Sequence, residues 1–251
     1  MNIESTIGEI RNELPERVRL VAVSKFHPNE MIMEAYRAGQ RIFGENHVQE
    51  VTRKYETLPK DIEWHFIGHL QTNKVKYIVP FVSLIHGVDT FKLLKEIDKQ
   101  AAKCDRTVAC LLQIRIAKEE TKFGFSFDEC RELLEQGEWN LMKHVDLRGM
   151  MGMATYTDDK VEIRNEFHSL KTFFDEIKGT YFRDDDRFKE ISMGMTHDYP
   201  LAIQEGSTLV RIGTKIFGER ITIDVSVRKA KEFPSKCSLM PERIGMIADS
   251  Y

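Results

Sequence analysis

Apolar residues recur along the chain at two spacings, one typical of helices and one typical of strands. Residues 3–16 predict an amphipathic helix, because their apolar side chains lie at helical spacing. These side chains belong to Ile3, Ile7, Ile10 and Leu14. Val21, Ala22 and Val23 are then apolar without a break. Such a run predicts a strand that is buried on both faces.

The alternation of strand-like and helix-like segments continues to about residue 220. Strands are predicted at 19–25, 41–44, 62–67, 82–86, 107–114, 144–149, 188–192 and 208–212. Helices are predicted at 28–39, 45–55, after 74, and at 90–102, 127–135, 159–178 and 198–205. About eight such repeats in one chain of this size favour a closed parallel (β/α)8 barrel, a TIM barrel, over an open doubly wound sheet.

The alternation is not interrupted by a linker rich in Pro, Gly or Ser. Residues 1–220 are therefore predicted to form a single domain that begins with the N-terminal helix. Beyond Arg220 the pattern stops. We expect residues 221–251 to form a C-terminal tail, either an appended arm or a partly disordered segment, and the sequence assigns no role to it.

The composition excludes several classes of function. Of the 251 residues, 41% are hydrophobic and 31% are charged, the formal net charge is −3, and no basic patch indicates a nucleic-acid partner. The apolar runs are too short to cross a bilayer and the N-terminus lacks signal-peptide features, so we expect a cytoplasmic protein with no membrane partner. The four cysteines lack CxxC spacing, and no metal site is predicted.

Lys25 is the first candidate site residue, because it stands where the first predicted strand ends. In parallel α/β folds the loops after the strands build the site. Partial dehydration there would favour the neutral amine, which is a nucleophile toward an aldehyde. The alternative is that Lys25 only extends to solvent at the strand end, and the strand alone does not decide between the two.

Two further groups of candidate residues follow the seventh and eighth predicted strands. Ser192 and Thr196 bound the first group, and Arg211, Gly213 and Thr214 form the second. Small residues followed by a short helix are what a phosphate site needs in these two loops, because backbone N–H groups then face the anion. Gly213 lets the backbone come close, the threonines add hydroxyl donors, and the arginine adds a fixed charge.

Five short motifs occur in one order over residues 18–220. They are Ala22-Val23-Ser24-Lys25; Phe43-Gly44-Glu45-Asn46 with Gln49-Glu50; His65-Phe66-Ile67-Gly68 with Leu70-Gln71-Thr72-Asn73-Lys74; Ser192-Met193-Gly194-Met195; and Gly206-Ser207-Thr208 with Val210-Arg211-Ile212-Gly213 and Ile216-Phe217-Gly218. Together they resemble the pyridoxal phosphate homeostasis protein family (YggS/PROSC). The resemblance implies a barrel like the N-terminal domain of alanine racemases, with pyridoxal 5′-phosphate (PLP) as cofactor.

The resemblance also implies which residues would hold the reactive part of PLP. Lys25 would carry the aldehyde carbon as an imine, that is, a Schiff base. Asn46 would lie beside the imine and the ring hydroxyl, where its amide can donate or accept a hydrogen bond. Arg211 would face the ring nitrogen, with the phosphate as its alternative partner. A guanidinium at the ring nitrogen would leave that nitrogen unprotonated and weaken the ring as an electron sink.

The phosphate of PLP would be held by the two later loops. Thr196, Gly213 and Thr214 would contact it directly, and Ser192 would help. No residue is predicted to be catalytic.

Two classes of function follow from a PLP-binding barrel. An amino-acid racemase would need a second acid on the cofactor face opposite to Lys25, and alanine racemases take it from a separate C-terminal β-domain for which this chain has too few residues. A carrier would hold PLP and pass it to apo-enzymes. We therefore predict a PLP-binding protein of PLP homeostasis, a monomer with apo-enzymes as partners. A weakly active racemase-like enzyme is the alternative, and a cofactor-free Schiff-base aldolase would leave the phosphate loops unexplained.

Overall fold

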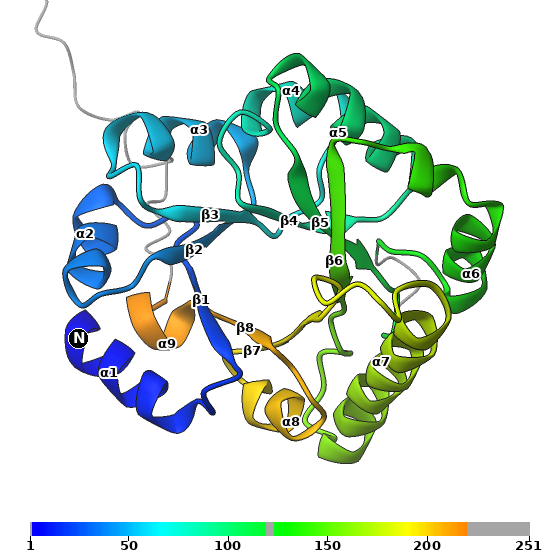
Figure 1. The fold of residues 1–251 in the computed structure, drawn as a ribbon. Coiled ribbons are helices and arrows are strands. Elements are labelled where there is room, and N and C mark those ends of the chain that lie inside the picture. The colour runs from blue at the N-terminus through cyan, green and yellow to red at the C-terminus, as the bar shows by residue number, and fades with distance from the viewer. Residues whose placement is uncertain (1, 119–122, 220–251) are drawn as a thin grey trace, which may run out of the picture. The chain divides into compact units, whose positions relative to one another are not determined.

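The structure is a computed structural model, and it describes residues 2–118 and 123–219. Within them, parallel strands pair in chain order from β1 to β8, and β8 returns to β1 to close a barrel. Figure 1 shows the strands as an inner ring with helices outside it. The predicted (β/α)8 barrel is confirmed. Its strands are β1 (Arg19–Val23), β2 (Ile42–Glu45), β3 (Glu63–Phe66), β4 (Leu84–Val88), β5 (Val108–Gln113), β6 (Val145–Met151), β7 (Glu190–Met195) and β8 (Leu209–Ile212).

The helices begin at the residues that favour helix starts. Thr90 caps α5 through its side chain, and Ser126 with Glu129 forms a capping box on α6. The α-helices are α1 (Ile3–Glu13), α2 (Asn29–Arg37), α3 (Val48–Thr57), α4 (Val75–Ile78), α5 (Phe91–Lys103), α6 (Phe127–Gln136), α7 (Lys160–Tyr181), α8 (Tyr199–Gln204) and α9 (Thr214–Phe217); the 3-10 helices are η1 (Thr72–Lys74) and η2 (Glu138–Leu141).

The hydrophobic core has two layers that follow from the period of two along each strand. Outward-facing side chains such as Phe43 and Trp64 are fully buried under the helices. Inward-facing apolar side chains form a small cluster inside the barrel, made of Val21, Leu84, Leu111, Met151 and Leu209. Polar side chains also lie inside the barrel, among them the buried His65, His86, Ser192 and Arg211, which are joined by hydrogen bonds. The interior of the barrel is therefore part apolar and part polar.

Some predicted boundaries were wrong by a few residues. The helix after the second strand begins at Val48 and not at Glu45, because Glu45 is the last residue of β2 and is fully buried there. The sixth and seventh strands extend to Met151 and Met195. These extensions bring the ends of β6 and β7 to the same end of the barrel as Lys25.

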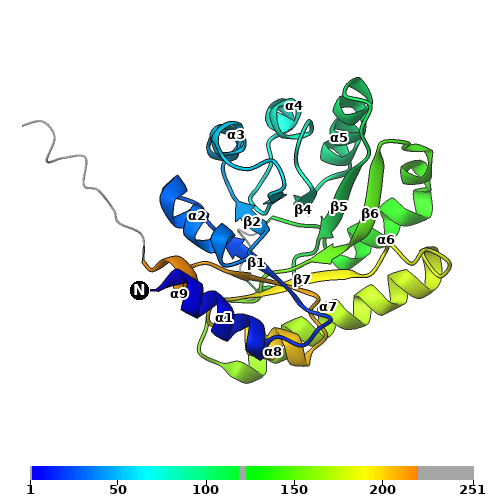
Figure 2. The same cartoon turned by 60° about the vertical axis from the view of Figure 1, so that its left-hand side comes forward.

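The N-terminal helix α1 buries Ile3, Ile7 and Ile10 and packs against α2 and α9. Figure 2 shows α1 and α9 close together on one side of the barrel. The predicted tail 221–251 lies outside the described residues. No helix in the described part of the chain is both long enough and apolar enough to cross a membrane.

Candidate cofactor-binding site

A cavity of about 580 Å³ opens at the carboxyl ends of β1 to β3 and β6 to β8. This is the end of the barrel at which loops build active sites. Its wall is formed by Val23, Lys25, His27, Asn46, Ile67, Met153, Tyr156, Met195, Thr196, His197, Arg211, Gly213, Thr214, Gly218 and Glu219. The structure thus brings together all of the predicted site residues except Ser192.

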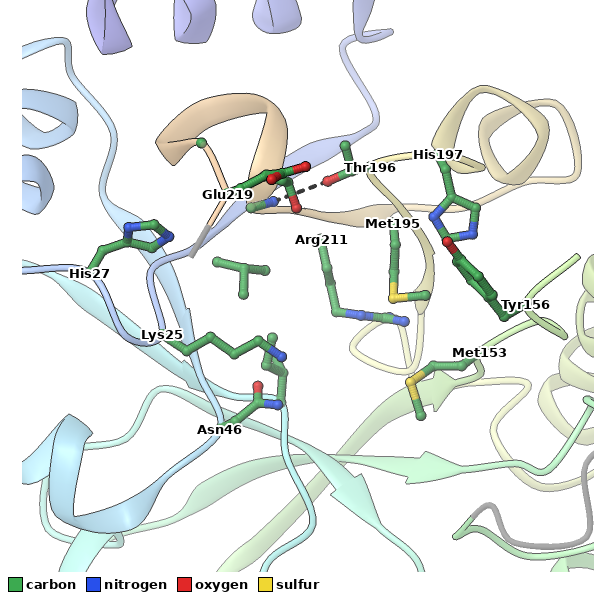
Figure 3. Close-up of a pocket in the computed structure, with 15 residues that line it drawn as sticks. Lys25, His27, Asn46, Met153, Tyr156, Met195, Thr196, His197, Arg211 and Glu219 are labelled. Atoms are coloured by element: carbon green, nitrogen blue, oxygen red, sulfur yellow. Dashed lines mark hydrogen bonds between the residues drawn. The ribbon is translucent and has the colours of Figure 1, made fainter. Parts of the chain in front are cut away.

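Lys25 and Asn46 enter the cavity from the loops after β1 and β2. Figure 3 shows both side chains reaching inward from one side, with Met153 and Tyr156 on the other. The position of Asn46 depends on Gly68, because a Cβ at Gly68 would lie 2.6 Å from the backbone oxygen of Asn46. The Oδ1 atom of Asn46 is buried and has no hydrogen-bond partner among the described residues. A ligand that donates a hydrogen bond would satisfy this acceptor.

The loops after β7 and β8 meet at the opposite edge of the cavity. The backbone N–H of Gly213 donates to Oγ1 of Thr196, with 3.4 Å between nitrogen and oxygen, as the dashed line in Figure 3 shows. A Cβ at Gly213 would lie 3.1 Å from the backbone oxygen of Val23. Helix α9 begins at Thr214, directly after this close approach. The arrangement matches the phosphate site that TIM barrels build from the same two loops and a short extra helix.

Arg211 lies on β8 and forms the floor of the cavity. Its side chain is buried, and burial lowers the pKa of the guanidinium to about 10, so it stays charged near neutral pH. One terminal nitrogen, Nη1, donates to Oγ of Ser192 at 2.6 Å, and the other, Nη2, donates to the backbone oxygen of Gly152 at 3.1 Å. These two bonds fix the plane of the guanidinium.

Ser192 therefore lies behind Arg211 and not on the cavity wall. Its hydroxyl is also 2.8 Å from Nδ1 of His86, and Nε2 of His86 is 3.0 Å from Nδ1 of His65. Because Arg211 can only donate, the serine O–H is available to donate to His86. When the serine O–H donates to Nδ1 of His86, Nε2 of His86 donates to Nδ1 of His65.

Both histidines are fully buried inside the barrel. Burial, with a smaller effect of the Arg19 charge, lowers the pKa of His65 to about 3, and burial lowers the pKa of His86 well below its ordinary value. Both rings are therefore neutral at physiological pH. The only positive charge in this row of hydrogen bonds is that of Arg211.

Several wall residues were not predicted from the sequence. His27, Tyr156 and His197 come from loops whose path depends on the closed barrel. Met153 and Met195 line the cavity, whereas Met150, Met151 and Met193 are buried in the core. The buried hydrogen-bonded row of Ser192, His86 and His65 had one signal in the sequence, a histidine within an otherwise apolar strand. His65 and His86 each carry this signal.

The residues present fit PLP on three independent features. A lysine amine reaches the cavity at one edge, and the close approach at Gly213 with the start of α9 offers a place for an anion at the other. The unpartnered Oδ1 of Asn46 lies in the same cavity as the lysine amine, and the ring hydroxyl of PLP would donate to it. In the described part of the chain, no group of three or more metal-ligating side chains could hold a metal ion.

Comparison with known proteins supports the same assignment of family. Residues 1–221 match the family described as "Alanine racemase, N-terminal domain". A pyridoxal phosphate homeostasis protein of Aquifex aeolicus is 42% identical over 204 residues, which cover 80% of this chain and 87% of that protein. A protein of the same name from Schizosaccharomyces pombe is 36% identical over 228 residues, covering 88% of this chain and 94% of that protein.

Solved structures show the same barrel. PipY of Synechococcus elongatus is 37% identical to this chain, and the match covers 86% of this chain and all of PipY. Its structures without and with PLP bound give TM-scores of 0.81 and 0.78. Alanine racemase of Clostridium difficile shares the fold, with a TM-score of 0.70 at 14% identity. The match covers 89% of this chain and 58% of that chain. The chain belongs to the pyridoxal phosphate homeostasis protein family, and its barrel is that of the alanine racemase N-terminal domain.

Proposed function

We propose that the protein binds PLP as a Schiff base on Lys25 and takes part in intracellular PLP homeostasis. One observation carries the proposal: a lysine, an unpartnered buried amide oxygen on Asn46 and a phosphate-type loop at Gly213 line one cavity. A structural relative that is 37% identical, PipY, has been solved with PLP bound. Two relatives of this chain, 42% and 36% identical to it, are named pyridoxal phosphate homeostasis proteins.

The chain's own groups would divide the binding between them. Lys25 would hold the aldehyde carbon, and Thr196, Gly213 and Thr214 would hold the phosphate. PLP supplies an electron-withdrawing ring that can stabilise a carbanion. Arg211 would oppose that property at the ring nitrogen, because it donates a hydrogen bond but does not give up its proton at neutral pH. Ser192 would act through Arg211 and would not touch the phosphate, which revises the role expected from the sequence.

We propose a carrier and not an enzyme, with apo-enzymes as the recipients of PLP. A racemase needs acid–base groups on both faces of the cofactor. Tyr156 and His197 could serve the second face, since both line the cavity on the side away from Lys25. Both residues are exposed, Tyr156 to 83%, so water would compete for any proton that they hold. General acid–base help is worth a factor of about 10² to 10⁴, and its loss leaves a slow side reaction.

The deciding experiment follows α-proton exchange of a panel of L-amino acids in deuterated water with the PLP-loaded protein. We expect no exchange above the rate of free PLP, and reactivation of an apo-enzyme by the same preparation. Fast exchange that is lost in Lys25→Ala, and also in Tyr156→Phe or His197→Gln, would establish the racemase-like enzyme instead. His168→Gln, a change at an exposed histidine on α7, is the matched control.

We further propose that residues 1–220 are the PLP-binding domain and that residues 221–251 are a tail not needed for binding. Among residues 2–118 and 123–219, every wall residue of the cavity lies between Val23 and Glu219. A chain ending at Arg220 should therefore bind PLP with unchanged affinity in an absorbance titration. A large loss of affinity would assign the tail to the site.

A further inference from the structure

Three charged residues form a buried cluster between β2 and α3, next to the turn that carries Lys25. We call Glu45, Glu50 and Lys54 the Lys54 cluster. Nζ of Lys54 donates to Oε1 of Glu45 and to Oε1 of Glu50, both at 2.7 Å. The exposed fractions of these side chains are 3% for Lys54, 0% for Glu45 and 11% for Glu50. Charged groups are rarely placed so deep without a specific purpose, because their desolvation is costly.

The Lys54 cluster contacts the residues on both sides of Lys25. Before it, the backbone oxygen of Ser24 accepts from Nζ of Lys54 at 2.8 Å, and the Ser24 hydroxyl donates to Oε1 of Glu45 at 2.6 Å. After it, the backbone N–H of Phe26 donates to Oε1 of Glu50 at 2.7 Å. Lys25 is thus held on both sides by one hydrogen-bonded set of groups.

Phe26 has an unusual backbone conformation that needs such support. Its φ is 66°, in the left-handed region that favours glycine. The N–H of His27 donates to the backbone oxygen of Ser24 at 3.1 Å, which closes a four-residue turn with Phe26 in its third position. Turns with a positive φ there usually have glycine. Phe26 is 55% exposed, and its ring packs against that of His47, with 5.1 Å between the ring centres.

We propose that the Lys54 cluster positions Lys25: it holds the strained Ser24–His27 turn and so directs the lysine amine into the cavity. The inference rests on the proposed function of Lys25 as the PLP-binding amine. Glu45, Glu50 and Lys54 are positioning residues, because they touch the backbone on either side of Lys25 and do not line the cavity.

The chemistry of the Lys54 cluster suits this role better than a role in stability. An apolar set of the same volume would often stabilise a fold as well or better than a buried ion pair. An apolar set could not accept the N–H of Phe26 or donate to the oxygen of Ser24, and the turn would then lose two of its fixed contacts. Burial raises the pKa of Glu45, and the Lys54 ammonium and the hydrogen bond from Ser24 oppose the rise.

The test uses Glu50, the most exposed member of the Lys54 cluster, because removing Lys54 would leave two buried carboxylates unpaired and endanger folding. Glu50→Ala removes the acceptor of the Phe26 N–H, whereas Glu50→Gln keeps an oxygen at that place. Phe26→Gly removes the strain, since glycine adopts a positive φ readily. Glu56→Ala, at an exposed glutamate of the same helix, is the matched control.

Two readouts are followed: the rate at which PLP absorbance shifts to the Schiff-base form, and hydrogen exchange of the Phe26 amide in the cofactor-free protein by NMR. In Glu50→Ala we expect imine formation to be about tenfold slower and the amide to exchange at least tenfold faster, as the loss of a hydrogen bond to a charged group implies. Glu50→Gln and Glu56→Ala should stay within about threefold of the wild type. Adding Phe26→Gly to Glu50→Ala should restore most of the rate of imine formation.

The two readouts separate the inference from the function on which it rests. If the wild type forms no imine on Lys25, the proposed function fails, and the amide exchange of Phe26 still tests whether Glu50 holds the turn. If the wild type forms the imine and Glu50→Ala matches it in both readouts, the Lys54 cluster does not position Lys25. The proposal would also be overturned if imine formation were slow in Glu50→Ala and equally slow after Phe26→Gly is added. Strain in the turn would then have no part in the effect.

Discussion

The hydroxyl of Ser192 lies 2.6 Å from Nη1 of Arg211, and the two residues stand on neighbouring strands, β7 and β8. The bond joins the cavity floor to the buried histidines behind it, because the same hydroxyl lies 2.8 Å from His86. Arg211 is thereby fixed from the side away from the cavity. Arg211 is therefore held in place by the barrel interior, whereas binding residues are usually carried by mobile loops.

Removing this bond should weaken PLP binding through Arg211. We expect Ser192→Ala to reduce PLP affinity by about 1.5–3 kcal/mol, the range for a hydrogen bond to a charged group. An absorbance titration measures the change. Ser207→Ala is the control, since this buried serine donates only to nearby backbone oxygens, among them that of Met193 at 2.8 Å. Equal affinity of Ser192→Ala and the wild type would show that Arg211 needs no support from Ser192.

A bulky side chain at Gly213 should disturb the phosphate loop more than loss of a hydroxyl beside it. The added Cβ would meet the backbone oxygen of Val23 at 3.1 Å and force β1 and β8 apart. We expect Gly213→Leu to abolish binding in a titration, whereas Thr214→Ala loses at most about 1.5–3 kcal/mol. Gly179→Leu is the control, because nothing lies within 4 Å of a Cβ at this glycine. Retention of PLP by Gly213→Leu would place the phosphate elsewhere.

The buried histidines make stability depend on pH. In the unfolded chain His65 and His86 bind protons with a pKa near 6.5, whereas in the folded protein the pKa of His65 is about 3. The unfolded state therefore binds more protons below about pH 6.5. The free energy of unfolding should therefore be highest above this pH. It should fall as the pH drops, by at most about 1.4 kcal/mol per pH unit for each histidine.

Urea unfolding between pH 7 and pH 5 measures this dependence. His86→Gln keeps polar atoms at the same place but does not titrate, so its stability should fall less steeply over this range. An unchanged slope in His86→Gln would mean that His86 is not held neutral in the folded protein.

The fold was predictable because its signals are local and repeated. The unbroken apolar run at Val21 to Val23 is a buried strand, and the helix predicted to begin at residue 90 is α5, which Thr90 caps. The positions of Lys25, Gly213 and Thr214 could also be predicted, since the carboxyl ends of parallel strands meet at one end of a barrel.

The remaining features depend on side-chain direction and on register, which a sequence pattern does not give. Ser192 was expected to help at the phosphate, and no pattern in the sequence indicated that its hydroxyl accepts from Arg211 on the neighbouring strand. Glu45 was expected in a helix, yet it ends β2 and pairs with Lys54 nine residues later. Neither contact follows from helical or strand periodicity, because each joins two different elements of the closed barrel.

The measurement that tests the central claim most directly is borohydride reduction of the PLP-loaded protein, followed by peptide mapping. Reduction fixes PLP to the amine that holds it. We expect the label on Lys25 and none on Lys54, whose ammonium is buried in its ion pairs, or on Lys215, which donates to Tyr199. Lys25→Ala should give no label. A label on another lysine, or none in the wild type, would contradict Lys25 as the PLP-binding residue.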